Sequence, residues 1–84
     1  MDARQSWDEC AALEAAKQAK TDKAVDLAAD AAMAACQDEA EKFMEKAQLP
    51  PHSLSRDEAA NATRELRDKI REGKVSLINE LRGQ

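Results

Sequence analysis

Aromatic and β-branched residues are scarce in this chain of 84 residues, which has one Trp, one Phe and no Tyr. With only two Val and two Ile as well, a β-sheet would lack the side chains that normally pack it. Helix breakers are equally rare, since the chain contains two Gly and two Pro. The rest of the composition is rich in Ala, Glu, Lys and Leu, which favours helix. We therefore expect an all-α fold in a single domain over residues 1–84.

Long apolar stretches are absent too. The longest runs are Ala clusters such as Ala31–Ala35, far short of the roughly 20 residues that a membrane-spanning helix needs. We expect no membrane insertion. Ala supplies half of the apolar residues, and burying an Ala contributes much less than the roughly 1.5–3 kcal/mol of a buried Leu or Phe. The core is therefore expected to be thin, and a domain of this size then needs a staple or a partner.

Residues that perform chemistry are few. The single His, His52, lies beside the Pro pair, and Cys10 and Cys36 are 26 positions apart, which matches neither zinc-ligand nor Cys-x-x-Cys redox spacing. Carboxylate pairs such as Asp26 and Asp30 have the i,i+4 spacing of a solvated helix face, and no Glu-x-x-His motif accompanies them. We expect no enzyme activity, no metal and no cofactor.

Charge is unevenly spread in this chain of net charge −4. Residues 1–53 carry 6 basic and 11 acidic groups, and residues 54–84 carry 7 and 6. The only basic stripe consists of Arg64, Arg67, Arg71 and Lys74, and no aromatic residue accompanies it for base stacking. This profile does not favour a nucleic-acid partner. It favours docking of the stripe on the acidic first part of the chain, or solvation.

Residues 1–48 are expected to form an antiparallel helical hairpin. Apolar residues at helical spacing predict helices over about 3–19 and 22–48, with Cys10 and Cys36 on their inner faces. Facing residues of a hairpin average to its turn, and the two cysteines average to position 23. They are therefore placed to form a disulfide; two reduced, buried thiols are the alternative. One continuous helix is the rival fold, and it would hold the cysteines about 39 Å apart.

A Pro-rich linker over about 49–54 ends the hairpin, and a long third helix is expected over about 55–82 of the last segment, residues 55–84. Ser55 and Glu58 have the spacing of a capping box. Gly73 interrupts the helix at a cost of about 1 kcal/mol relative to Ala, and we interpret it as a close approach or a break. The expected inner stripe comprises Ala59, Ala62, Leu66, Ile70, Leu77 and Leu81.

After Gly73 this helix is apolar on two sides, with Val75 and Ile78 on one and Leu77 and Leu81 on the other. A monomer with a thin core exposes part of such a segment, which indicates a contact surface. Together with the basic stripe it gives the candidate interaction surface, for which we expect a protein partner or a second copy of the chain: Val75, Leu77, Ile78, Leu81, Arg64, Arg67, Arg71 and Lys74.

Three features resemble short, uncharacterised exported helical proteins of alphaproteobacteria: Trp7-x-x-Cys10, the Ala-rich stretch Ala28–Ala32 before Cys36, and the ending Val75…Leu81-Arg82. The resemblance implies export to the periplasm or secretion, and an oxidised Cys10–Cys36 pair. Asp2-Ala3 would suit a mature N-terminus in that pattern. The chain shows no signal peptide, so a cytoplasmic location is the alternative.

The expected function is that of a non-catalytic helical interaction or structural domain, exported, which binds a protein partner or itself through the C-terminal helix. One alternative is a periplasmic holdase-like stress chaperone that exposes apolar surface at low pH. Another is a cytosolic phage-type or antitoxin-type inhibitor, whose acidic hairpin would mask a basic partner.

Overall fold

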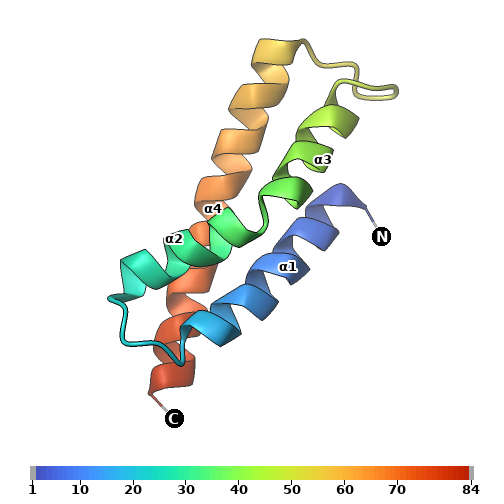
Figure 1. The fold of residues 1–84 in the computed structure, drawn as a ribbon. Coiled ribbons are helices and arrows are strands. Elements are labelled where there is room, and N and C mark those ends of the chain that lie inside the picture. The colour runs from blue at the N-terminus through green and yellow to red at the C-terminus, as the bar shows by residue number, and fades with distance from the viewer. Residues whose placement is uncertain (1, 84) are drawn as a thin grey trace.

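The computed structural model describes residues 2–83, which form four helices and no strand. They are α1 (Ala3–Gln18), α2 (Val25–Ala35), α3 (Gln37–Ala47) and α4 (Arg56–Arg82). Figure 1 shows α4 running the length of the molecule, with α1 beside α3 and α2 crossing α4. The all-α fold class is confirmed. The number of helices is four rather than the expected three.

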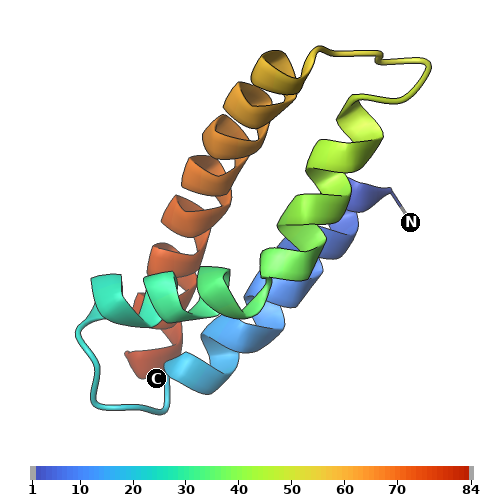
Figure 2. The ribbon, with the colours of Figure 1, turned by 45° about the horizontal axis from the view of Figure 1, so that its top comes forward.

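The expected second helix over 22–48 is two helices that meet at Cys36 (Figure 2). The φ and ψ angles of Cys36 are −107° and 26°, and its N–H donates to the carbonyl oxygen of Met33 at 3.1 Å. This three-residue spacing replaces the four-residue spacing of an α-helix. The sequence pattern hid the break because the buried stripe continues through it, with Ala32 before the bend and Ala40 after it, and because no Gly or Pro marks it.

The turn between α1 and α2 is closed by short local hydrogen bonds. The Thr21 hydroxyl donates to the carbonyl oxygen of Gln18 at 2.7 Å and accepts from the N–H of Lys23 at 3.4 Å. From the far end of the chain, the Arg82 guanidinium donates to the carbonyl oxygens of Ala19, Gln18 and Thr21 at 3.0 to 3.3 Å. The Gln18 carbonyl oxygen already accepts from Thr21, and Arg82 adds a donor to it and to the carbonyls of the turn, which fixes α4 to the end of α1.

The capping box at the start of α4 is present. The Ser55 hydroxyl accepts from the Glu58 N–H at 3.1 Å, and the Glu58 carboxylate accepts from the Ser55 N–H at 3.0 Å. The hydrogen bond from the Ser55 backbone N–H, together with the nearby Ser55 hydroxyl, lowers the pKa of the Glu58 carboxyl below its usual value, because it favours the charged form. The helix then continues for 27 residues through Gly73 without a break. A Cβ at Gly73 would meet no atom within 4 Å, so the expectation of a break or a close approach there is wrong within this fold.

The inner stripe of α4 differs from the expected one in its second half. Leu66 and Ile70 are buried as expected, but the stripe then continues through Lys74 and Ile78, and Leu81 is 37% exposed. The reason is the crossing of α2 over this half of α4, which turns the buried face towards α2. Ile78, expected on an outer side, is fully buried, and it belongs to a cluster with Ala28, Ala29, Ala32 and Ala15.

Most of the buried apolar side chains belong to two clusters. The first surrounds Trp7, which is fully buried and lies 5.7 Å from Phe43 between ring centroids. Its other buried members are Ala11, Met33, Cys36, Ala40, Leu66 and Ile70. The second is the Ala-rich cluster around Ile78. Large side chains are thus concentrated in the first cluster, and small ones let the helices approach closely in the second.

Candidate functional site

Cys10 and Cys36 form a disulfide, with their Cα atoms 6.0 Å apart. The bond joins the middle of α1 to the bend between α2 and α3, and Cys36 is 1% exposed. In this state neither sulfur is a nucleophile or a metal ligand. The cysteines therefore act as a covalent clamp between segments that are 26 residues apart.

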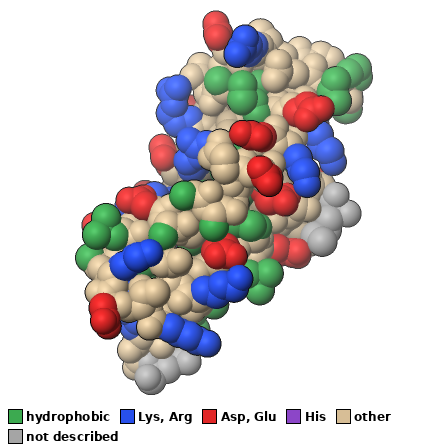
Figure 3. Space-filling model, in the orientation of Figure 1, with side chains coloured by type: hydrophobic (Ala, Val, Ile, Leu, Met, Phe, Trp, Pro, Cys, Tyr) green, Lys and Arg blue, Asp and Glu red, His purple; other side chains and the backbone are tan. Residues whose placement is uncertain are grey.

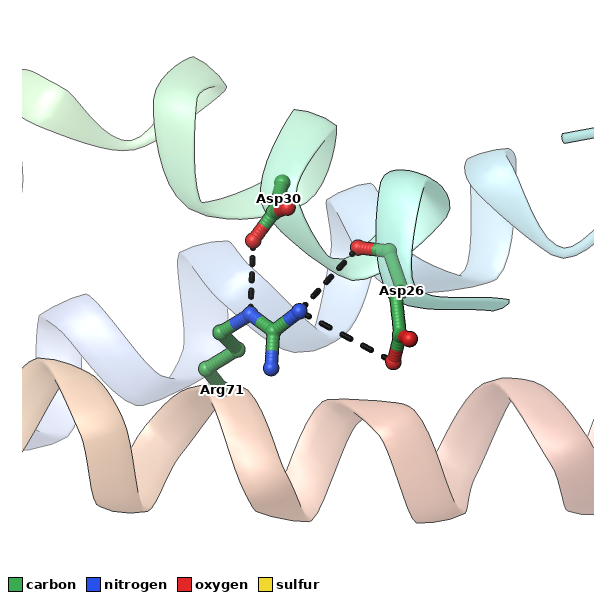
Figure 4. A network of polar contacts seen from close by, with 3 residues as sticks. All are labelled: Asp26, Asp30 and Arg71. Carbon is green, nitrogen blue, oxygen red and sulfur yellow. Dashed lines mark hydrogen bonds and ion pairs between the residues drawn. The ribbon is translucent and has the colours of Figure 1, made fainter. Parts of the chain in front are cut away.

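Half of the basic stripe on α4 is occupied by acidic partners within the chain. The Arg71 Nε donates to the Asp30 carboxylate at 2.6 Å, and its Nη2 lies 3.4 Å from the Asp26 carbonyl oxygen and 3.8 Å from the Asp26 carboxylate (Figure 4). The hydrogen bond to Asp30 raises the pKa of the guanidinium above its usual value. The nearly buried Lys74 ammonium pairs with Asp8 at 2.8 Å. Docking of the stripe on the acidic helices is therefore confirmed for Arg71 and Lys74.

Arg64 and Arg67 differ from these two, because neither forms an ion pair within residues 2–83. Arg64 is exposed and Arg67 is half-buried. Both side chains therefore remain available for a partner.

The apolar part of the expected interaction surface lies largely inside the fold. Ile78 is fully buried, and Val75 and Leu77 are half-buried against the second cluster. Leu81 alone of the four is exposed. Figure 3 shows a face on which side chains of both charges surround small, separate apolar groups. Of the apolar contact surface expected on α4, only Leu81 and the exposed parts of Val75 and Leu77 are accessible to a partner.

A hollow that the sequence did not reveal lies between the start of α1 and the middle of α4, and we call it the Gly73 groove. Its volume is about 340 Å³. Its lining consists of Asp2, Arg4, Gln5, Asp8, Leu66, Lys69, Ile70 and Gly73. The one signal of it in the sequence was a Gly within a helical pattern.

A second hollow, which we call the Phe43 groove, lies where the start of α1, the end of α3, the linker and α4 meet. Its volume is about 350 Å³. Its lining consists of Asp2, Ala3, Arg4, Phe43, Lys46, Ala47, His52, Leu54 and Ala62. No sequence pattern indicated this groove, because it needs four separate segments to be placed together.

Within residues 2–83, no group of three or more His, Cys, Asp or Glu side chains is arranged to hold a metal ion. None of the helices α1 to α4 combines the length and the apolarity needed to cross a membrane.

Comparison of the chain with models of protein families, with curated proteins and with solved structures gives no match.

Proposed function

We propose that this chain is a non-catalytic helical binding module that engages a protein partner through α4, at the Gly73 groove. Gly73 carries the proposal. A Gly inside a helix costs about 1 kcal/mol relative to Ala, and nothing in the fold requires one here. The chain has no Gly with positive φ among its described residues, and a Cβ at position 73 would meet open space. This uncompensated cost supports the approach of another molecule to the backbone.

The chemistry of the Gly73 groove suits a small apolar side chain with charged neighbours. Leu66 and Ile70 form an apolar floor, 8% and 6% exposed. Arg4 and Lys69 supply positive charge at the groove, and neither has an acidic partner within residues 2–83. Asp8 is paired with Lys74 and is thus already held in place. The other acid of the lining, Asp2, uses its carboxylate to cap α1. The two unpaired cations therefore favour an acidic segment of the partner.

Site-specific photo-crosslinking in the producing cells tests this proposal. A photo-reactive residue replaces Gln5, an exposed and uncharged residue of the groove lining, or Ser76, an exposed α4 residue outside the lining. We expect a discrete adduct from position 5 and none from 76, and loss of the adduct when Gly73→Leu fills the groove. The mass of the adduct tells whether the partner is another protein or a second copy. An unchanged adduct in Gly73→Leu, or none from position 5, would refute the proposal.

We also propose that the module works in an oxidising compartment, the periplasm or the cell exterior. The Cys10–Cys36 disulfide supports this location, because such bonds persist there and are rare in the cytosol. Rapid alkylation of intact cells followed by mass spectrometry tests it. We expect no alkylated cysteine without a reductant and two after reduction, the reduced sample serving as control. Alkylation of both thiols in unreduced cells would contradict the assignment.

A further inference from the structure

The Phe43 groove has apolar walls of a size that suits a small ligand. Phe43, Leu54 and Ala62 are half-buried, and Ala47 is 9% exposed, so much of each side chain is already out of water. The volume of about 350 Å³ lies within the roughly 300–1,000 Å³ of typical ligand pockets. The walls alone would accept any slender apolar group.

The charges around these walls are unbalanced. Arg4 and Lys46 line the groove against one acid, Asp2, and the imidazole of His52 lies in the same lining. The Asp2 carboxylate is occupied, since it accepts the N–H of Gln5 at 2.7 Å and caps α1. Arg4 and Lys46 have no acidic partner among residues 2–83. Positive charge thus gathers beside an apolar groove in a chain of net charge −4.

We propose that the Phe43 groove binds a carboxylate that carries a single aliphatic chain. The chain lies against Phe43, Ala47, Leu54 and Ala62, where its burial is favourable in proportion to the area removed from water. The carboxylate is attracted by Arg4 and Lys46, which select an anion over a neutral or cationic head group. The two grooves share Asp2 and Arg4 in their linings, but the apolar walls around Phe43 belong to this groove alone, and ligand binding there does not require the partner proposed for the Gly73 groove.

Trp7 provides a built-in reporter for this site. It is the only Trp of the chain, it is fully buried, and its ring packs on Phe43, which lines the groove. A ligand that contacts Phe43 therefore changes the surroundings of the indole. Titration with decanoate, kept below the concentration at which it forms micelles, should give a saturable change in Trp7 emission while helicity by circular dichroism stays constant.

Three comparisons test whether decanoate binding is specific to the Phe43 groove. Decyltrimethylammonium, with the same chain and the opposite charge, should not bind. Lys46→Glu should weaken decanoate binding by about tenfold or more, whereas Lys42→Glu, on the same helix but outside the lining, should not. Ala62→Leu should block the groove, whereas the exposed Asn61→Leu beside it should not. Calorimetry provides a second measure of affinity for each variant.

Several results would overturn the proposal. They are the absence of saturable binding, equal binding of the cationic ligand, or full affinity in Lys46→Glu or in a folded Ala62→Leu. Gly73→Leu should leave decanoate binding intact, which keeps this test apart from that of the partner-binding proposal. Arg4 is left unchanged throughout because it lines both grooves.

Discussion

Trp7 and Ile78 are the two largest fully buried side chains, and each lies in a different core cluster. The sequence placed Trp7 correctly on an inner face, because its neighbours at helical spacing are apolar. The indole N–H is buried without a hydrogen-bond partner among the described residues, at a cost of roughly 1–3 kcal/mol. Its apolar contacts have to outweigh that cost. Ile78 was misplaced because its burial depends on the path of α2, which the pattern of α4 does not contain.

Ile78→Ala tests the observed stripe of α4 against the one expected from the sequence. Ile78 is fully buried, so its truncation should lower the free energy of unfolding by about 2–5 kcal/mol. Leu81→Ala is the matched control, since Leu81 is 37% exposed and should cost about 1 kcal/mol or less. Urea denaturation measures both. If Leu81→Ala lowered the free energy of unfolding more than Ile78→Ala, the inner stripe expected from the sequence would be supported instead.

The lowered pKa of Glu58 predicts how the stability contributed by the capping box depends on pH. Its pKa is lowered in the folded state, so its stabilising contribution is fully present above the unfolded pKa of about 4.3. The contribution is lost as the pH falls through the lowered folded value. We expect the melting temperature to fall less between pH 6 and pH 3 in Glu58→Gln than in the unchanged protein. Glu65→Gln, at an exposed α4 position outside the capping box, is the control. Parallel pH curves for the Glu58 variant and the unchanged protein would contradict this.

Helix boundaries were predictable where local chemistry sets them. The capping box gave the start of α4, and the Pro pair gave the end of α3 within two residues. The bend at Cys36 was not predictable, because the same apolar stripe serves both sides of it. At Gly73 the error was the reverse, because a break was expected and the helix is continuous. A Gly costs about 1 kcal/mol relative to Ala, which is too little to break a helix that tertiary contacts hold on both sides.

Gly73→Ala should stabilise the protein. The helix gains propensity and the unfolded chain loses freedom, while the added Cβ meets no atom within 4 Å. We expect the free energy of unfolding to rise by about 0.5–1 kcal/mol. Thermal and urea unfolding measure the change, and Ser76→Ala at a nearby exposed position gives the baseline for propensity alone. A loss of stability would show that the fold itself requires this Gly.

At the scale of the whole molecule, the disulfide was predictable and the grooves were not. The two cysteine positions indicated a turn near position 23, with a disulfide or two reduced thiols as the alternatives; the structure joins the cysteines and has a turn between Gln18 and Val25. The pairing of Arg71 with Asp30 was foreseeable only as a docking of basic on acidic helices. The Phe43 groove needs the placement of four segments, including the linker that carries His52. No single periodicity encodes such a placement.

Removing the disulfide should destabilise the whole domain. In the chain-entropy account, a closed loop of 26 residues contributes about 3.5 kcal/mol by restricting the unfolded chain. We expect the double variant Cys10→Ser/Cys36→Ser to lose about that amount of unfolding free energy. Reduced protein of unchanged sequence is the control and should show a similar loss. Equal stability with and without the bond would mean that the helices hold the bend at Cys36 unaided.

The division of the core into a large-residue cluster and an Ala-rich cluster determines which substitutions each half of the domain tolerates. Around Ile78, Ala28, Ala29 and Ala32 are fully buried, and adding methylenes to such a close-packed site costs about 1–3 kcal/mol. Around Trp7 the constraint is reversed, because shrinking a large side chain leaves a cavity, while the flexible Met33 adapts to its neighbours. A saturation mutagenesis scan should therefore find one half of the domain intolerant of gain in volume and the other intolerant of loss.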